Sequence, residues 1–388
     1  MQPIEAPLSF YRATSLLTTT MRLYIIAGEA SGDLHGSNLI RALRSLRPDL
    51  HCRVWGGDLM QAAGGELVKH YRDLAFMGFV EVLKNLRTIL RNIAFCKRDM
   101  LDYQPDALVL IDYPGFNLRI ARWAKARGIR VVYYISPQIW AWHQSRVHAI
   151  RRDVDQMLVI LPFEQDFFRQ HGMDVEFVGH PLLDAVDGAQ EASSALGRDS
   201  GRLVALLPGS RRQEVERMLP VMLQVTRFFP DYRFVVVRAS SLPAEYYQPF
   251  LRQYPQVALH SGSAYEVLCH AEAALVKSGT STLETALMDV PQVVCYAGNP
   301  LSYSIAKRVV KVRYISLVNL ILDEPLVEEL IQHDLNVGRL RSALQHVLSP
   351  EGQAAVLEGY KKLRHRLGDG GASERAAQAI LSAMQGLR

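Results

Sequence analysis

Cysteine is scarce in this 388-residue sequence, and its spacing argues against two classes of cross-linked protein. The four cysteines form no Cys-x-x-Cys pair and lie far apart, at Cys52, Cys96, Cys269 and Cys295. Neither a zinc site nor a disulfide framework is therefore expected, and we expect a reducing, cytoplasmic location. The sequence also lacks an apolar run of about 18 residues, which a membrane-spanning helix needs.

A strong excess of either charge is also missing. The formal net charge is only +5, which fits a phosphorylated substrate or an anionic membrane surface as well as nucleic acid. No nucleic-acid-binding motif accompanies this charge, so no nucleic acid is expected as a partner. The length, together with 49% apolar residues, is comfortable for two globular domains.

Residues 1–20 precede a second methionine, Met21, and the first strand-like run. They include Glu5 and two prolines and have no basic start followed by an apolar core, so they do not form a signal peptide. We expect a disordered extension or a misassigned start, outside the fold.

Apolar runs without alternation recur along the chain, which is typical of parallel strands covered on both faces. We expect strands at 23–27, 52–55, 107–111, 131–135, 157–161, 203–207, 234–237, 273–276 and 292–296. Amphipathic stretches alternate with them, which predicts an α/β protein built from two Rossmann-like domains.

The stretch 184–202 is rich in Ala, Gly, Ser and Asp and is the expected seam between the domains. We place the first domain at 21–185 and the second at 186–366. A last helix is expected at 372–384, within a C-terminal segment 367–388. It would cross back to the first domain or pack on a partner subunit, which leaves a homodimer open.

Two motifs in the second half each follow a strand-like run and open a helix-like one, SGTSTLE at 278–284 and PGSR at 208–211. Gly279 lets a backbone pass close to a ligand, and the N–H groups and dipole of a helix start favour an anion. Arg211 adds a positive charge. Glu284 has the right length to accept two hydrogen bonds from a ribose diol.

Together these features predict a diphosphate–ribose site, the part by which a nucleotide-sugar is held. Further contacts are expected from Gly209, Ser210, Ser278 and Thr280. The structural alternative is that Thr280 only caps a helix and Glu284 only lies on its surface.

The sequence GEASGDLHG at 28–36 follows the first strand and precedes a helix expected to open at about Leu39. Its glycines recur every four residues, not as Gly-x-Gly-x-x-Gly, and its carboxylates would repel a bare pyrophosphate. Such a loop suits sugar hydroxyls or a reacting alcohol. Glu29 and Asp33 are therefore candidate catalytic residues, with two acceptor-side neighbours, Ser31 and Gly32. The alternative is a tight turn in which Asp33 caps a helix.

A carboxylate ends the apolar run at 107–111. In open α/β sheets the ligand crevice lies at the carboxyl ends of the strands, so Asp112 is well placed as a general base for an attacking hydroxyl. Partial burial would raise its pKa toward neutrality. Asn117 is expected nearby on the acceptor side. The alternative is a turn-forming Asp before Pro-Gly.

An aromatic segment, SPQIWAWH at 136–143, ends in His143, a candidate for acid–base work or phosphate contact. Its tryptophans are expected in the core. The Asp-Val-Asp sequence at 153–155 imitates the Asp-x-Asp metal-binding motif found in some glycosyltransferases, but it precedes a strand instead of ending one. We therefore infer no required metal.

The sequence from Phe76 to Arg98 has apolar residues at helical spacing, and its apolar surface is wider than one core stripe needs. The nearby charges are mostly basic, which is typical of a helix lying in a membrane interface. The expected membrane contacts are Met77, Phe79, Val80, Val82, Leu83 and Leu86. A buried core helix is the alternative.

These motifs together resemble the lipid-A-disaccharide synthase family, from Met21 to near the end of the chain. The matching segments are 27–36, 112–117, 136–142, 161–164, 178–181, 208–214 and 278–284. The chain departs from the family pattern in its residues 1–20 and in Tyr113-Pro114-Gly115.

The resemblance implies the GT-B fold, in which two Rossmann-like domains face one another across a cleft and the C-terminal helix crosses back. It implies inverting transfer of 2,3-diacylglucosamine from UDP-2,3-diacylglucosamine to the 6-hydroxyl of 2,3-diacylglucosamine 1-phosphate, with no cofactor. Asp112 would be the base, and Arg211, Glu284 and Asn319 would contact UDP. The enzyme would sit peripherally on the cytoplasmic face of the inner membrane.

Two other classes stay open. A UDP-N-acetylglucosamine epimerase or another nucleotide-sugar protein of the same fold would need no acylated acceptor, and the over-apolar basic helix argues against it. A membrane-surface scaffold would use its sites only for binding, and the acidic 28–36 loop facing a nucleotide site argues against that.

Overall fold

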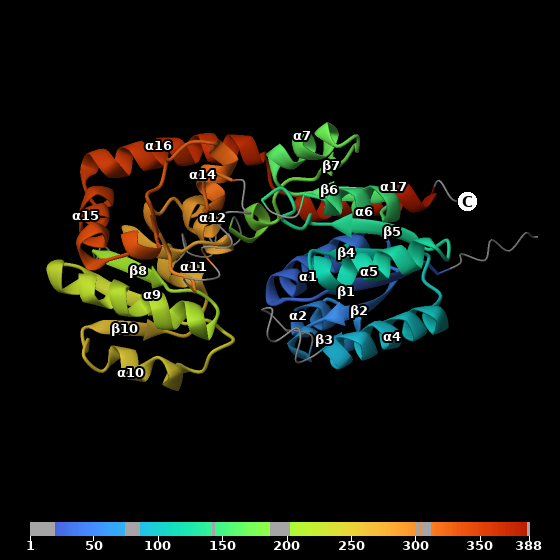
Figure 1. The fold of residues 1–388 in the computed structure, drawn as a ribbon, viewed down its shortest axis with the longest axis horizontal. Helices are drawn as coiled ribbons and strands as arrows, with labels where there is room; N and C mark the ends of the chain where they lie inside the picture. The colour runs from blue at the N-terminus through green and yellow to red at the C-terminus, as the bar shows by residue number, and fades with distance from the viewer. Residues whose placement is uncertain are drawn as a thin grey trace, which may run out of the picture.

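Two parallel β-sheets organise the chain (Figure 1). The computed structural model describes residues 20–73, 86–141, 144–186, 202–299, 303 and 312–385. The first sheet has the strand order β3-β2-β1-β4-β5-β6-β7, and the second has the order β10-β9-β8-β11-β12-β13. All neighbouring strands in both sheets are parallel. If β8 is numbered as the first strand of the second sheet, the strand order there is 3-2-1-4-5-6. The first six strands of the first sheet have the same order, which is that of the Rossmann fold. The predicted fold class is confirmed.

The strands are short, and most match the predicted apolar runs within one or two residues. In the first sheet they are β1 (Arg22–Ala27), β2 (His51–Gly56), β3 (Glu66–His70), β4 (Ala107–Ile111), β5 (Arg130–Tyr134), β6 (Gln156–Val159) and β7 (Glu176–Phe177). In the second they are β8 (Leu203–Leu207), β9 (Arg233–Val237), β10 (Val257–His260), β11 (Ala273–Lys277), β12 (Gln292–Tyr296) and β13 (Glu329–Ile331).

Helices connect the strands and cover the sheets. Those of the first half are α1 (Ala30–Leu46), α2 (Asp58–Ala62), α4 (Leu86–Tyr103), α5 (Pro114–Lys125), α6 (Arg146–Asp153) and α7 (Pro162–Gln170). Those that follow β8 are α9 (Arg212–Val225), α10 (Gln248–Leu251), α11 (Ala264–Leu268), α12 (Thr280–Leu287), α14 (Leu317–Leu322), α15 (Val337–Val347), α16 (Pro350–Leu367) and α17 (Ala372–Gln385). Single 3₁₀ turns lie at Tyr71–Asp73, Thr226–Phe228, Ala244–Tyr246 and Gln332–Asp334.

The central strand β1 shows why the strand sequences lack polar alternation. Leu23 and Ile25 pack with α1 and α17 on one face of the sheet, while Tyr24 and Ile26 pack with α4 and α5 on the other. All four side chains are fully buried. A strand covered on both faces buries every side chain, so an apolar residue is favoured at each position.

The last helix returns to the first sheet. In Figure 1, α16 lies over the second sheet and α17, next in sequence, lies among the elements of the first. Helix α17 packs on α1 of its own chain and buries Ala376, Ala377 and Ile380 completely. Arg375 Nε also donates to the Val178 carbonyl at 2.9 Å. The predicted crossing back is confirmed, and a homodimer stays a prediction.

The predicted seam falls mostly at 187–201, outside the described residues, so the domain boundaries stay predictions. The predicted extension also lies outside them, apart from residue 20. Within the part of the chain that the structure describes, no helix combines the length and apolarity needed to cross a membrane.

Candidate active site

The site lies where the strand order of each sheet reverses. In the first sheet this point is between β1 and β4, and in the second it is between β8 and β11. Loops that leave such a pair of strands diverge and open a crevice at the carboxyl ends. Glu29 and Asp112 follow β1 and β4, and the 209–211 and 278–280 turns follow β8 and β11.

The two sets of loops face one another across a pocket. Most of its lining comes from the first domain and includes Ser31, Gly32 and Asp112, while Thr280 and Leu317 come from the second. Arg211 Nη2 also lies 3.9 Å from Glu29 Oε2, which joins the two domains. The predicted cleft is confirmed.

Asp112 occupies a turn with left-handed backbone at two consecutive residues. The φ angles are 44° at Asp112 and 49° at Tyr113, a conformation that costs a non-glycine residue about 1–2 kcal/mol. The Asp112 carbonyl accepts hydrogen bonds from the Tyr133 hydroxyl and from Asn117 Nδ2, the latter at 2.7 Å. Asn117 Nδ2 also donates to the Ile111 carbonyl at 3.2 Å. Asn117 was expected to face the acceptor, but its amide holds this turn.

The surroundings of the Asp112 carboxyl group raise its pKa. Burial raises its pKa from the ordinary value to about 7, and the nearby Glu29 carboxylate adds to the rise. Burial also raises the pKa of Glu29, against the opposing charge of Arg211. A carboxyl group with a pKa near the working pH is an effective general base.

The helix that follows β1 begins at Ala30, not at about Leu39 as predicted. The glycines at 28, 32 and 36 recur at the period of a helix, and that spacing was the missed signal. A Cβ on Gly32 would lie 3.0 Å from Ala27 Cβ, and one on Gly36 would lie 2.7 Å from Met60 Sδ. The glycines therefore let α1 pack closely on its neighbours.

Asp33 lies in the first turn of α1 and is not part of the lining of the cleft pocket. Its Oδ1 accepts from the backbone N–H groups of Gly57 and Met60, at 2.7 and 3.0 Å, and Oδ2 accepts from Leu59 N at 3.2 Å. These groups open α2, so Asp33 caps a helix distant in sequence. The geometry favours the capping interpretation over the predicted catalytic one.

The turn after β8 is organised by Glu214. Its Oε2 accepts from Ser210 N at 3.0 Å and from Arg211 N at 3.3 Å. Gly209 has φ 113°, and a Cβ there would lie 2.5 Å from the same oxygen. Two backbone donors of this turn, those of Ser210 and Arg211, are therefore engaged within the protein, and its charged contribution to the cleft is the Arg211 side chain.

The turn after β11 differs in its backbone N–H groups. In the described part of the chain, no acceptor is found for the N–H groups of Gly279 and Thr280 at the start of α12. Lys277 Nζ lies 2.9 Å from Glu214 Oε1 and 3.4 Å from the position of a Cβ on Gly279. The α12 start, with Lys277 and Arg211 nearby, is thus the more suitable of the two turns for an anion.

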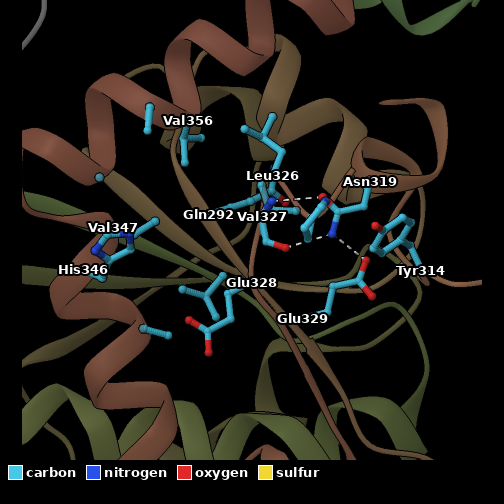
Figure 2. A pocket seen from close by; sticks show the side chains of 15 residues that line it. Gln292, Tyr314, Asn319, Leu326, Val327, Glu328, Glu329, His346, Val347 and Val356 are labelled. Carbon is cyan, nitrogen blue, oxygen red and sulfur yellow. Dashed lines mark hydrogen bonds between the residues drawn. The ribbon is translucent and has the colours of Figure 1, made fainter. Parts of the chain in front are cut away.

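Two predicted nucleotide contacts are engaged elsewhere. Ser278 Oγ donates to the Ile315 carbonyl at 2.7 Å. Figure 2 shows Asn319 bonded to Val327 and Glu329: its Oδ1 accepts from Val327 N at 2.9 Å, and its Nδ2 donates to Glu329 Oε1 at 3.0 Å. The pocket in Figure 2 lies at the amino ends of β12 and β13, away from the cleft. The geometry favours a structural role for Asn319.

The cleft pocket also contains polar residues for which no role was predicted: His35, Ser136, Gln138, Glu164 and His180. Burial lowers the pKa of His35 to about 4. Burial also lowers the pKa of His180, with a further contribution from the nearby His35, to about 3. Both imidazoles are therefore neutral at pH 7. Ser136, Glu164 and His180 follow the ends of β5, β6 and β7. Their shared position after successive parallel strands was the signal that could have found them.

Several predicted residues lie outside the described part of the chain. His143 is one of them, and so are the predicted membrane contacts from Met77 to Leu83. Leu86 begins α4, but its side chain is not described.

The sequence comparisons agree with one another. The sequence model of a family described as lipid-A-disaccharide synthetase matches residues 23–383. A curated protein named lipid-A-disaccharide synthase from Trichlorobacter lovleyi is 41% identical over 375 residues, covering 94% of this chain and 98% of that protein. One of the same name from Geobacter metallireducens is 42% identical over 370 residues, covering 93% and 96%.

Solved structures share the fold at much lower identity. A UDP-GlcNAc 2-epimerase from Neisseria meningitidis, bound to UDP-GlcNAc, has a TM-score of 0.67 at 12% identity and covers 93% of this chain and 100% of its own. The glycotransferase of kitacinnamycin has a TM-score of 0.63 at 14% identity and covers 94% and 99%. The epimerase alternative therefore has only a likeness of fold in its favour.

The pKa of Asp112 can be measured without any substrate. Titration of ¹³C-labelled aspartate carboxyls by NMR, with the Asp112 signal identified by Asp112→Asn, should show a midpoint at about pH 7. Glu29→Gln should move this midpoint to lower pH, because it removes a neighbouring negative charge. An ordinary midpoint near about pH 4 would contradict the geometry.

Asp33→Ala should lower the free energy of unfolding by about 2–4 kcal/mol, because it leaves buried N–H groups of α2 without an acceptor. Denaturant melts give the value. The exposed Asp174 is a matched control, and Asp174→Ala should change the free energy by less than about 0.5 kcal/mol. Equal midpoints for the two variants would refute the capping role.

Proposed function

Because the chain belongs to the lipid-A-disaccharide synthase family, whose members are glycosyltransferases, we propose that it joins two acylated glucosamine units. The donor is UDP-2,3-diacylglucosamine, and the acceptor is the 6-hydroxyl of 2,3-diacylglucosamine 1-phosphate. The products are the β-1,6-linked disaccharide 1-phosphate and UDP.

The observation that carries this proposal is the position of Asp112 across the cleft from the second domain's anion-binding turn. The Asp112 carboxylate takes the proton of the acceptor 6-hydroxyl as its oxygen attacks the anomeric carbon. The bond between that carbon and the diphosphate oxygen breaks, and its electron pair leaves with UDP. A single displacement of this kind inverts the anomeric centre.

The second domain supports departure of UDP. Free N–H groups at the start of α12 and the Arg211 side chain face the cleft and stabilise the negative charge that develops on the diphosphate. Glu284, one turn into α12, accepts hydrogen bonds from the ribose hydroxyls. Arg211 is paired with Glu29 before the nucleotide binds, and the diphosphate replaces that partner.

The transfer is proposed to need no metal ion. The acids of the 153–155 sequence are engaged in structural contacts: Asp153 accepts from Arg152 at 2.6 and 2.7 Å, and Asp155 accepts from Val131 N at 2.9 Å and pairs with Lys125. Positive side chains and backbone donors replace the metal at the diphosphate.

The first domain is proposed to rest on the anionic cytoplasmic face of the inner membrane, where both acylated substrates reside. Helix α4 supports this, because Leu90 and Leu101 are 56% and 51% exposed. They are eleven residues apart, about three turns, and so share one face. Arg87 and Arg98 are also exposed on α4, which gives this face both apolar and basic character.

Asp112→Asn should lower turnover by about 10²–10⁴-fold, because the amide cannot accept the hydroxyl proton. The assay supplies the UDP-diacylglucosamine donor and the 1-phosphate acceptor and follows UDP and disaccharide. Affinity for UDP, measured by calorimetry, should be unchanged, since Asp112 belongs to the other domain.

Two controls accompany this assay. The exposed Asp174→Asn should leave turnover unchanged. A chelator should also leave it unchanged, and a complete loss restored by metal would overturn the metal-free mechanism. Turnover of Asp112→Asn within a few-fold of wild type would make Glu29 the next candidate base.

Leu90→Ser with Leu101→Ser should weaken sedimentation with anionic vesicles by roughly tenfold or more, because each half-exposed leucine contributes about 1 kcal/mol of apolar burial in the interface. Leu46→Ser with Leu59→Ser is a matched pair, since these leucines are each 42% exposed but lie on α1 and α2. Thermal unfolding should be similar in all variants. Equal sedimentation of the two pairs would argue against α4 as the membrane face.

A further inference from the structure

Glu284 is a partly buried carboxylate that has no cationic partner within the described residues. Its hydrogen bonds come from hydroxyl groups: Tyr265 Oη donates to Glu284 Oε1 at 3.1 Å, and the Ser281 hydroxyl bonds the same carboxylate. Burial raises the pKa of Glu284, and both hydroxyls oppose the rise. A partly buried carboxylate without a cationic partner is costly to keep ionised. Such groups are common in ligand-binding sites.

Tyr265 is well placed to hold this carboxylate. It lies on α11, whose first turn is fixed by Ser263 Oγ accepting from Tyr265 N at 3.3 Å. Burial raises the pKa of Tyr265, and the charge of Glu284 raises it further. The hydroxyl therefore stays protonated and acts as a donor, and it connects α11 to α12.

We infer that Tyr265 is a positioning residue that orients the Glu284 carboxylate toward a ribose diol, an inference that rests on the proposed nucleotide site. Each carboxylate oxygen has two lone pairs, and Tyr265 occupies one of those on Oε1. Together with the Ser281 hydroxyl, this contact restricts rotation of the carboxylate, and two of its four lone pairs remain for ligand hydroxyls. A preoriented acceptor loses less side-chain entropy on binding, so affinity for the diol is higher.

Tyr265→Phe should weaken UDP binding by roughly tenfold, the usual effect of losing one hydrogen bond to a charged group. Binding of 2′,3′-dideoxy-UDP should be unchanged, because that nucleotide lacks the diol through which Tyr265 acts. Calorimetry gives both dissociation constants. Retained binding of the dideoxy nucleotide also shows that the variant is folded.

A double-mutant cycle separates positioning from general stability. In a Glu284→Ala background, Tyr265→Phe should have no further effect on UDP binding, since the group it positions is gone. Tyr232→Phe is the matched control, because Tyr232 hydrogen-bonds Glu272 at the amino end of β9 in the same domain. It should leave both dissociation constants unchanged.

The outcomes distinguish the inference from the function on which it rests. If Glu284→Ala weakens UDP and the dideoxy nucleotide equally, the ribose contact of the proposed nucleotide site is wrong. If Glu284→Ala discriminates between the nucleotides and Tyr265→Phe does not, only the positioning role is wrong. The positioning role would also be wrong if Tyr265→Phe weakened binding of both nucleotides equally. It would be wrong, too, if Tyr265→Phe weakened UDP binding as much in the Glu284→Ala background as in the wild type.

Discussion

The whole site depends on one topological constraint, the reversal of strand order in each parallel sheet. At β1 and β4, and again at β8 and β11, neighbouring strands send their following loops in opposite directions. A crevice must open there, because no connection passes across it. The two crevices face one another, so groups that follow several strands of the first sheet meet Thr280, which follows β11 of the second sheet, in a single pocket.

The meeting of the loops places two acids, Asp112 and Glu29, near one another in a partly buried site. Burial raises the pKa of Asp112 to about 7, and the nearby negative charge of Glu29 adds to the rise. Arg211 from the opposite domain offsets part of this repulsion. A diphosphate in the proposed nucleotide site would compete with Glu29 for the Arg211 side chain.

Other acids in the same motifs stabilise the fold, because their carboxylates accept hydrogen bonds from backbone N–H groups. Asp33 organises the start of α2, and Glu214 organises the turn that carries Arg211. Asp33 satisfies buried N–H groups that would be costly to leave without an acceptor, whereas the donors bound by Glu214 belong to the exposed residues Ser210 and Arg211. Their carboxylates are chemically identical to those of Glu29 and Asp112, and the partners alone separate the two roles.

The sequence by itself determined most of the strands, the two Rossmann-like domains and the motifs at the strand ends, because apolar runs and glycine turns are local patterns. The strands β3, β7, β10 and β13 were not predicted. Asp112 could be predicted on this basis, since it directly ends a buried strand. Only the tertiary structure decided that Asp33 caps α2 and that Asn319 is bonded to Val327 and Glu329. It also brought Glu164 and His180 to the cleft, and Tyr265 to the Glu284 carboxylate. Hydrogen-bond partners distant in sequence leave no periodic trace, so the direction in which a polar side chain points is settled only when the chain is folded.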